Sequence, residues 1–540
     1  MIRKSIPFIF ALAFGLIGFS AYTLLSQSPP SPPTSEENSQ NINISIEQQK
    51  KSIIQYINES NSISAKAALE KLIDDYGNTD AVVPAVYDIA EKYREKRNYW
   101  SARSAYKYIV DNFPLNAQAV FAKRGILISD IAIENLTEAK IELEKLLTNY
   151  SSEPNISQAV FEVADAYYWF KYYKEANQLY QKVIDNYPSS DYAMWAQMGL
   201  AISYIADSND KAALEATDKL AANYASNEKL PEALTYIAGR YVWSKRYDKG
   251  LDIYSNIINK FPQSTWAEGA KFESAKVGVY TFIDANDEPN TLIAIESLIN
   301  DFNDKPELPG VIYEFASRVD SQNWYEPNSL IKSIYQRIVD KFPDNPIAKK
   351  AQLSIARLNV TSLINSGDDA NAFTNIDKLI SDFNGLPDLP VEIDHIAQKC
   401  YNDGLRMFHK GKLDKSSENY QKSIKVHEII IKKLPYSDLT PISYYFAAVL
   451  YSDYLKQYQK GIDYFQKIVD TWPDFEFTWN AQYFIGFYYK ILRDSGNLSP
   501  SEANPKIEQA YETFINKYSN NDLVPFAALE LGHIKFMKNQ

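Results

Sequence analysis

The chain is poor in the residues with which enzymes do chemistry. Its 540 residues include one cysteine, four histidines and 18 glycines. No histidine lies in an HExxH motif, and no phosphate-binding loop, dinucleotide-binding fingerprint or nucleophile elbow occurs. A single cysteine also excludes an intrachain disulfide. We therefore expect a protein that is not an enzyme, with no catalytic, cofactor-binding or metal-binding residues.

Basic residues are in the minority. The chain has 56 Lys and Arg against 68 Asp and Glu, which gives a formal net charge of −12. An acidic chain is a poor ligand for nucleic acid, so we expect no nucleic-acid partner. The lone Cys400 is expected to be a buried structural thiol, because free cysteine is among the most buried residue types.

One charge-free apolar run occurs near the start, at residues 6–25. A helix of that length spans roughly 30 Å, the thickness of the bilayer's hydrocarbon core. Arg3 and Lys4 precede the run, so the positive-inside rule leaves the N-terminus in the cytoplasm. Residues 1–25 are thus predicted to be a signal anchor in the cytoplasmic membrane, with the chain displayed in the periplasm or at the cell surface. The alternative is a cleaved signal peptide and a secreted or periplasmic protein.

A repeat organises the remaining chain after a Pro/Ser/Asn-rich linker expected at residues 26–46. An aromatic residue closes a helical pattern every 37 residues, at Tyr76, Phe113, Tyr150, Tyr187, Tyr224 and Phe261. Each period holds two amphipathic helical patterns, as in residues 157–188. Such a period indicates a solenoid. We predict an all-α fold of about 11–12 helix-pair units, regular over 47–275 and degenerate over 276–540.

The degenerate half has longer steps between the closing aromatic residues. We expect the extra residues around Asp284 and around Trp324 to lengthen the turns between helices. A step of 51 residues predicts one unusually long helix from about Lys412 to Leu434. A polar loop is expected from Arg493 to Pro505. The last apolar pattern, Leu523 to Met537, is expected to form a single helix that caps the stack.

The best units resemble the tetratricopeptide repeat family in their small and aromatic positions. The matching residues are Ala164, Tyr167, Ala176, Tyr180 and Pro188 in one unit, Ala90, Tyr93, Ala102, Tyr106 and Pro114 in a second, and Ala238, Tyr241, Gly250, Tyr254 and Pro262 in a third. The resemblance implies a right-handed α–α superhelix that binds proteins or peptide segments. The period is most like that of the envelope-dwelling members, which include outer-membrane assembly lipoproteins and the Tol-Pal coordinator protein. No cysteine lies near the apolar run, which excludes a lipoprotein anchor.

The family resemblance also implies where ligands bind. In this family the first helix of each pair lines the concave side of the superhelix. The candidate binding residues on that side are Tyr87, Glu91, Arg94, Phe161, Asp165, Tyr168, Trp169, Glu232, Thr235 and Val242. The Lys and Asn of the family's clamp for a peptide C-terminus are absent. The aromatic clusters at 167–173 and 483–489 exceed one helical stripe, so some of their rings should lie at the surface.

Two functions stay open. The first is a non-catalytic scaffold that binds envelope proteins and assembles or tethers an envelope complex. The second is an envelope protein that binds glycan on exposed Tyr and Trp rings. Carboxamides beside the rings of a groove would favour glycan, and a continuous apolar patch would favour protein.

Overall fold

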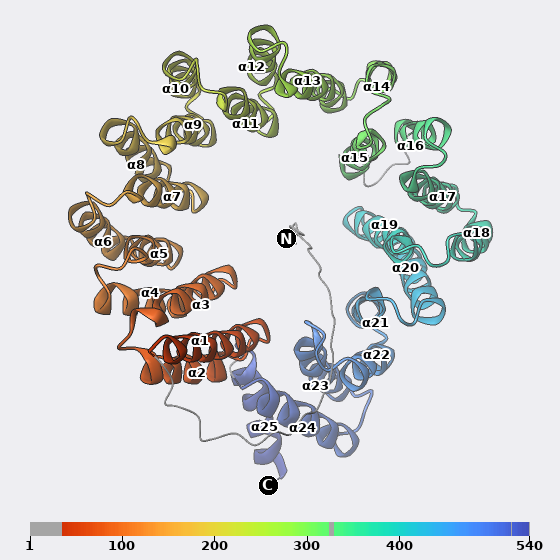
Figure 1. The fold of residues 1–540 in the computed structure, drawn as a ribbon. Helices are drawn as coiled ribbons and strands as arrows, with labels where there is room; N and C mark the ends of the chain where they lie inside the picture. Colours follow the sequence, from red (N-terminus) through yellow and green to blue (C-terminus); the bar gives the residue numbers. More distant parts are fainter. Residues whose placement is uncertain (1–34, 323–328, 520, 539–540) are drawn as a thin grey trace, which may run out of the picture. The chain divides into compact units, whose positions relative to one another are not determined.

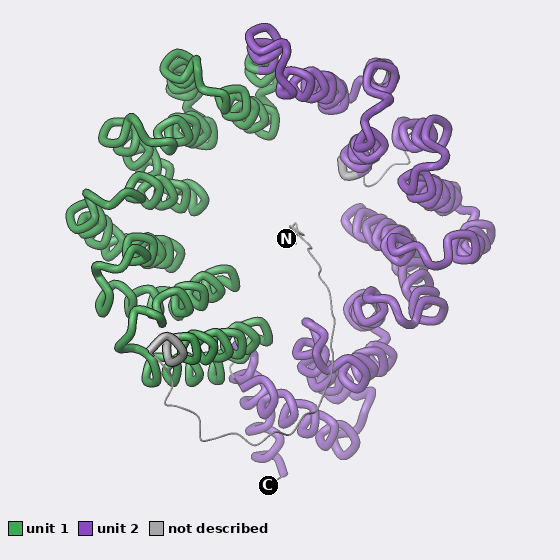
Figure 2. Tube along the Cα trace, in the orientation of Figure 1, with its two compact units in different colours: residues 1–253 green, residues 254–540 purple. Residues whose placement is uncertain are grey.

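The computed structural model describes residues 35–322, 329–519 and 521–538, and these fold into helices without a strand (Figure 1). Twenty-five α-helices lie in the described residues, which agrees with the predicted all-α class and with about twelve pairs plus a last helix. The chain divides into two compact units, residues 1–253 and 254–540 (Figure 2).

The helices follow one another in pairs along each unit, and the two helices of a pair pack together, as α3 with α4 and α7 with α8 do. Unit 1 contains α1 (Ser35–Asn58), α2 (Ser62–Tyr76), α3 (Val83–Glu95), α4 (Tyr99–Asn112), α5 (Ala119–Ala132), α6 (Leu136–Asn149), α7 (Ile156–Trp169), α8 (Tyr173–Asn186), α9 (Asp191–Ala206), α10 (Asp210–Asn223) and α11 (Leu230–Trp243). The next helix, α12 (Tyr247–Lys260), crosses the boundary between the units.

Unit 2 continues the pairs with helices of more variable length. They are α13 (Thr265–Asp284), α14 (Glu288–Asp301), α15 (Leu308–Gln322), α16 (Ser329–Lys341), α17 (Pro346–Ser366), α18 (Asp369–Asp382), α19 (Leu389–His409), α20 (Leu413–Lys433), α21 (Leu439–Val449), α22 (Tyr458–Thr471), α23 (Thr478–Asp494), α24 (Pro500–Lys517) and α25 (Val524–Lys538). A short π-helix, Leu450–Tyr454, extends α21.

The small and aromatic repeat positions form the core, as predicted. Ala164 and Ala176 are fully buried, and the large rings of Tyr167 and Tyr180 are almost completely so. The Tyr180 ring lies against Gly199 of the next pair, where a Cβ atom would approach Tyr180 Cε1 to 2.6 Å. Glycine is therefore required for this close approach. Cys400 is also buried, as expected, and burial raises the pKa of its thiol to about 12.

The turn inside each pair of unit 1 is built in the same way. Its middle residue is in the left-handed region, with φ between 57° and 67°, at Ser60, Arg97, Glu134, Lys171, Ser208 and Lys245. At Lys171 the amide N–H donates to the carbonyl of Tyr168 (3.0 Å), and the following N–H of Tyr172 donates to that of Tyr167 (2.8 Å). This is the Schellman motif that ends helices. The 37-residue period thus fixes backbone conformation as well as core positions.

Unit 2 departs from two of the predictions. The extra residues near Asp284 lengthen α13 to 20 residues, and α17 and α19 have 21 residues each, so the steps that contain α13, α17 and α19 are long because these helices are long. The extra residues around Trp324 lie outside the described residues. The expected polar loop is also shorter, because Ser499 caps α24 in a capping box with Glu502 and Pro505 lies inside the helix.

Two other predictions for unit 2 are confirmed. The long helix expected between Lys412 and Leu434 is α20, which begins at Leu413 and ends at Lys433. The single terminal helix is α25, which packs against α24 through a cluster that includes Ala527, Leu531 and Ile534. The period and phase of the apolar residues were sufficient to locate both helices.

The structure tests only part of what was predicted for the N-terminal region. The apolar run at residues 6–25 lies outside the described residues. Within the described residues, no helix is both long and apolar enough to cross a bilayer. A linker was expected at residues 26–46, but the structure has a helix in part of this stretch, because α1 begins at Ser35. Ile46, Ile53 and Ile57 lie on one face of α1 and are buried against the first pairs, which explains why this polar stretch is helical.

Candidate functional site

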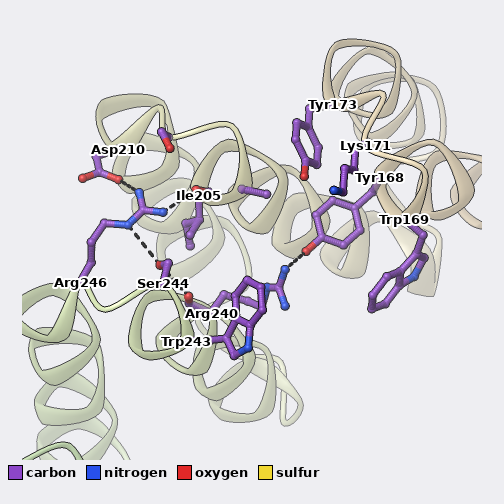
Figure 3. Close-up of a pocket in the computed structure, with 12 residues that line it drawn as sticks. Tyr168, Trp169, Lys171, Tyr173, Ile205, Asp210, Arg240, Trp243, Ser244 and Arg246 are labelled. Atoms are coloured by element: carbon purple, nitrogen blue, oxygen red, sulfur yellow. Dashed lines mark hydrogen bonds and ion pairs between the residues drawn. The ribbon is translucent and has the colours of Figure 1, made fainter. Parts of the chain in front are cut away.

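A groove of about 670 Å³ lies in unit 1 where α7, α9 and α11 end and the turns to their partner helices begin (Figure 3). We call it the aromatic groove. It is lined by Tyr168, Trp169, Lys171, Tyr173, Ile205, Ala206, Ser208, Asp210, Arg240, Trp243, Ser244 and Arg246. Three successive pairs therefore contribute to one hollow, which no single pair could form.

The repeat itself explains why the groove is hollow. Trp169, Ala206 and Trp243 are each separated by 37 residues and occupy the last position of α7, α9 and α11. The two tryptophans are 72% and 78% exposed. Because the equivalent residue between them is alanine, the middle pair leaves space that the outer pairs fill with indole rings. A large–small–large series thus makes a groove with two aromatic walls.

Arg240 joins the walls of the aromatic groove. Its Nη2 donates a hydrogen bond to the hydroxyl of Tyr168, which comes from α7 (Figure 3). Its guanidinium carbon lies 4.9 Å from the ring centroid of Trp243 and 5.7 Å from that of Tyr168, both within cation–π range. The Tyr168 ring in turn packs edge-on against Trp169, with centroids 5.4 Å apart. The cation and the rings hold one another in place.

The opposite side of the groove is an ion-pair cluster. Asp210 accepts hydrogen bonds from both Lys249 and Arg246. These bonds lower the pKa of Asp210, the bond from Lys249 contributing most. Arg246 also donates to the carbonyl of Ile205 (2.6 Å) and to the hydroxyl of Ser244 (3.1 Å). The charges on this side are thus satisfied within the protein.

A second, smaller groove of about 290 Å³ lies on the other side of Trp169 and contains Arg94, Arg124, Glu162 and Asp165. Its floor is a network centred on Arg124 of α5, which is only 7% exposed. Arg124 Nη2 donates to Tyr87 Oη (2.7 Å) and to Glu91 Oε1 (2.6 Å), and Nη1 donates to Glu162.

Glu91 is the acceptor on which this network converges. Tyr106 donates to its Oε1 atom (2.6 Å), and Arg94 Nε donates to its Oε2 atom (3.1 Å). Burial alone would raise the pKa of Glu91, but the hydrogen bonds from Tyr106 and Arg94 and the charge of Arg124 outweigh burial and lower it. Most of the charged side chains in the second groove are therefore already paired with one another.

The structure brings some of the predicted site residues together. Arg94, Asp165, Tyr168 and Trp169 line the two grooves, while Tyr87 and Glu91 belong to the network beneath. The cluster at 167–173 is exposed mainly at Trp169, whereas the rings at 483–489 are half-buried or buried.

The other predicted site residues line neither groove. Phe161 packs between the rings of Tyr180 (5.9 Å) and Tyr192 (5.5 Å). Thr235 donates its hydroxyl hydrogen to the carbonyl of Pro231 (2.8 Å). The remaining members of this group are Glu232 and Val242, the latter packed against Gly250 in the next helix.

Sequence reasoning missed Arg240 and Trp243, because the family offsets selected Glu232, Thr235 and Val242 in α11. The groove lies at the turn edge of the pairs, by which we mean the edge where α7, α9 and α11 end and the turns to their partner helices begin. An alignment of the repeats by the 37-residue period shows the alternation of Trp169, Ala206 and Trp243, and so contains the signal for the hollow.

Comparison with known proteins identifies one of these pairs. A family model described as tetratricopeptide repeat matches residues 158–190, which contain most of α7 and all of α8. This stretch is a tetratricopeptide repeat. It supplies Tyr168, Trp169 and Tyr173 to the aromatic groove, so one wall of the groove is built on this repeat. No protein of curated function matches the chain.

Solved structures of helical repeat proteins are also similar. A tetratricopeptide repeat protein from Parabacteroides merdae has 13% identity and a TM-score of 0.30 over 50% of this chain and 96% of its own. Pseudomonas aeruginosa pilF has 16% identity and a TM-score of 0.27, over 44% and 100%. A structure of Naa15/Naa10 bound to HypK-THB has 12% identity and a TM-score of 0.33, over 91% and 79%. At such scores nothing about partners follows for this chain.

Proposed function

We propose that this protein is a non-catalytic scaffold that binds segments of partner proteins in the aromatic groove and so assembles or tethers a complex. The observation that carries the proposal is the pair of exposed tryptophans, Trp169 and Trp243, which face a groove of about 670 Å³. Tryptophan and arginine are enriched among the residues that dominate binding between proteins. The tetratricopeptide repeat at 158–190, which forms one wall, belongs to a family that binds proteins and peptides.

The chemistry of the groove favours protein over glycan. Stacked sugar rings are usually accompanied by side chains that hydrogen-bond their hydroxyl groups. None of the twelve described residues that line the groove is Asn or Gln. Its charged groups are instead a guanidinium on aromatic rings, the ammonium of Lys171 and an ion pair between Arg246 and Asp210. A peptide with apolar side chains fits this lining better than a neutral sugar.

The cell envelope is the setting we propose for the scaffold. The support is the apolar run at residues 6–25, preceded by Arg3 and Lys4 and followed by no basic residue until Lys50. That pattern orients a signal anchor with the repeats outside the cytoplasmic membrane. If the run is instead cleaved as a signal peptide, the repeats are released to the same side.

Chemical crosslinking of the full chain in its own cells tests this function. The Trp169→Ala, Trp243→Ala double variant removes both aromatic walls. Trp100→Ala is the matched control, because Trp100 is 67% exposed but lies in α4, outside both grooves. We expect a defined set of envelope proteins to crosslink to the wild type and to the Trp100 variant, and to be lost from the double variant. Capture of polysaccharide alone would contradict the proposal, as would a set of proteins that the double variant retains.

A further inference from the structure

The charges of the aromatic groove are of mainly one sign. Its lining residues include three cations, Lys171, Arg240 and Arg246, and one carboxylate, Asp210. Asp210 is paired with Arg246 and with Lys249 of α12. Asp207, in the turn after α9, is exposed but does not line the groove. On a chain with a net charge of −12, this groove is a local cationic site.

Arg240 is the cation best placed to receive a ligand. Among the described residues, its side chain has one hydrogen bond, to the neutral hydroxyl of Tyr168. A guanidinium carries five N–H donors in a rigid plane, so most of them remain available. The rings of Trp243 and Tyr168 keep this plane oriented. Arginine in such a position pairs with a carboxylate through two parallel hydrogen bonds.

The tryptophans define what lies beside the carboxylate. Trp169 and Trp243 are the most exposed large rings of the lining, and both belong to the same groove as Arg240. Apolar side chains that cover them would remove much of the roughly 150–250 Å² of surface that one large aromatic side chain can bury. Water would then be excluded from the ion pair, which strengthens it.

We propose that the aromatic groove binds an extended peptide through a carboxylate that pairs with Arg240, with apolar side chains of the peptide on Trp169 and Trp243. This inference rests on the proposed scaffold function and names the chemistry of the partner segment. The carboxylate is that of an Asp or Glu side chain, and the peptide's C-terminus is the alternative source that the test below separates. The site differs from a concave-face clamp of Lys and Asn residues, because it lies at the turn edge and uses a guanidinium held by rings.

Synthetic peptide arrays probed with the full chain test the proposal. The first probes are acetylated, amidated peptides with leucine and tryptophan on either side of a central glutamate, and the same peptides with glutamine at the centre. We expect the glutamate peptides to bind about tenfold more tightly, the loss expected when one charge-assisted contact is removed. A third set has the central glutamine and a free C-terminal carboxylate. Recovered binding in this set, without tighter binding of the glutamate peptides, would identify the terminus as the source and overturn the side-chain assignment.

Four variants separate recognition from folding. Arg240→Gln should abolish the preference for glutamate, whereas Tyr168→Phe, which removes only the internal hydrogen bond of Arg240, should keep it. Ala206→Trp should fill the hollow and abolish binding of all peptides. Ala132→Trp places the same side chain at the equivalent position of α5, outside both grooves, and should leave binding unchanged.

Specific results would overturn this inference. They are equal binding of glutamate and glutamine peptides, a preference that survives Arg240→Gln, or binding of acidic oligosaccharides with none of the peptides. The proposed function fails separately. If the double tryptophan variant loses its crosslinked proteins but no preference for glutamate exists, the groove binds proteins and the carboxylate pairing is wrong. If that variant keeps all its crosslinked proteins, the scaffold function of the groove is wrong.

Discussion

Arg240 in α11 donates a hydrogen bond to the hydroxyl of Tyr168 in α7, 72 residues earlier in the chain. Each of the two residues lies in the first helix of its pair, and the complete pair α9–α10 lies between them in the sequence. The bond passes the end of α9, whose Ile205 and Ala206 line the same groove. In a repeat protein, stability comes mainly from contacts between neighbouring repeats. This bond is an additional link between pairs that are not neighbours.

The first prediction follows from that link. Tyr168→Phe removes the acceptor and leaves the ring in place, so the free energy of local opening in α7 should fall by about 1 kcal/mol. Native-state hydrogen exchange of the α7 amides measures it. Tyr173→Phe is the control, because in the described part of the chain the Tyr173 hydroxyl has no hydrogen bond while its ring packs 5.9 Å from that of Tyr168. Equal losses in the two variants would show that the bond contributes nothing.

The second prediction concerns a close approach in the core. Gly199→Ala should destabilise unit 1 by roughly 1–3 kcal/mol, because its Cβ atom would meet the buried ring of Tyr180 at 2.6 Å. Gly278→Ala should instead stabilise α13 by roughly 0.5–1 kcal/mol, because no atom lies within 4 Å of its Cβ position and alanine favours a helix. Thermal unfolding of both variants provides the comparison. A stabilised Gly199 variant would contradict the packing described here.

The fold was largely predictable because the apolar and aromatic residues that form its core recur at a regular spacing in the sequence. Tyr167 and Tyr180 lie at repeat positions, and their burial follows from one helical stripe meeting the next. The length of α20 followed from the phase of its apolar residues. Longer helices in place of longer turns, as in α13, were missed because a helix and a turn can absorb the same number of residues.

The site was less predictable because it depends on combinations of repeats. The hollow exists only when Trp169, Ala206 and Trp243 come side by side, and no single repeat contains that information. The direction of Arg240 depends on a hydroxyl two pairs away. The family offsets selected Tyr168 and the aromatic cluster at 167–173 pointed to Trp169, but neither signal included Arg240 and Trp243 of the other wall.

The third prediction concerns the left-handed turn residues. Arg97 has φ of 59°, a conformation that costs a non-glycine residue roughly 1–2 kcal/mol. Arg97→Gly should remove that cost and stabilise the second pair by roughly 0.5–1 kcal/mol after the entropy of glycine is subtracted. The neighbouring Lys96 has φ of −80°, so Lys96→Gly should be destabilising. Chemical unfolding of the two variants checks the opposite signs, and the same sign in both would contradict this account of the turn.

The last prediction concerns pH. Burial raises the pKa of Asp165 from 3.8 to about 6, although the hydroxyl of Tyr180 donates a hydrogen bond to it (2.5 Å). The folded state thus favours the protonated acid, so this residue's contribution to stability is complete below pH 3.8 and is lost as pH rises through about 6. Asp165→Asn, which keeps an acceptor for Tyr180, should therefore be more stable than wild type at pH 7, with the advantage shrinking towards pH 4. Melting temperatures of both proteins across this range measure the difference, and an advantage that is constant with pH would show that Asp165 does not titrate in this way.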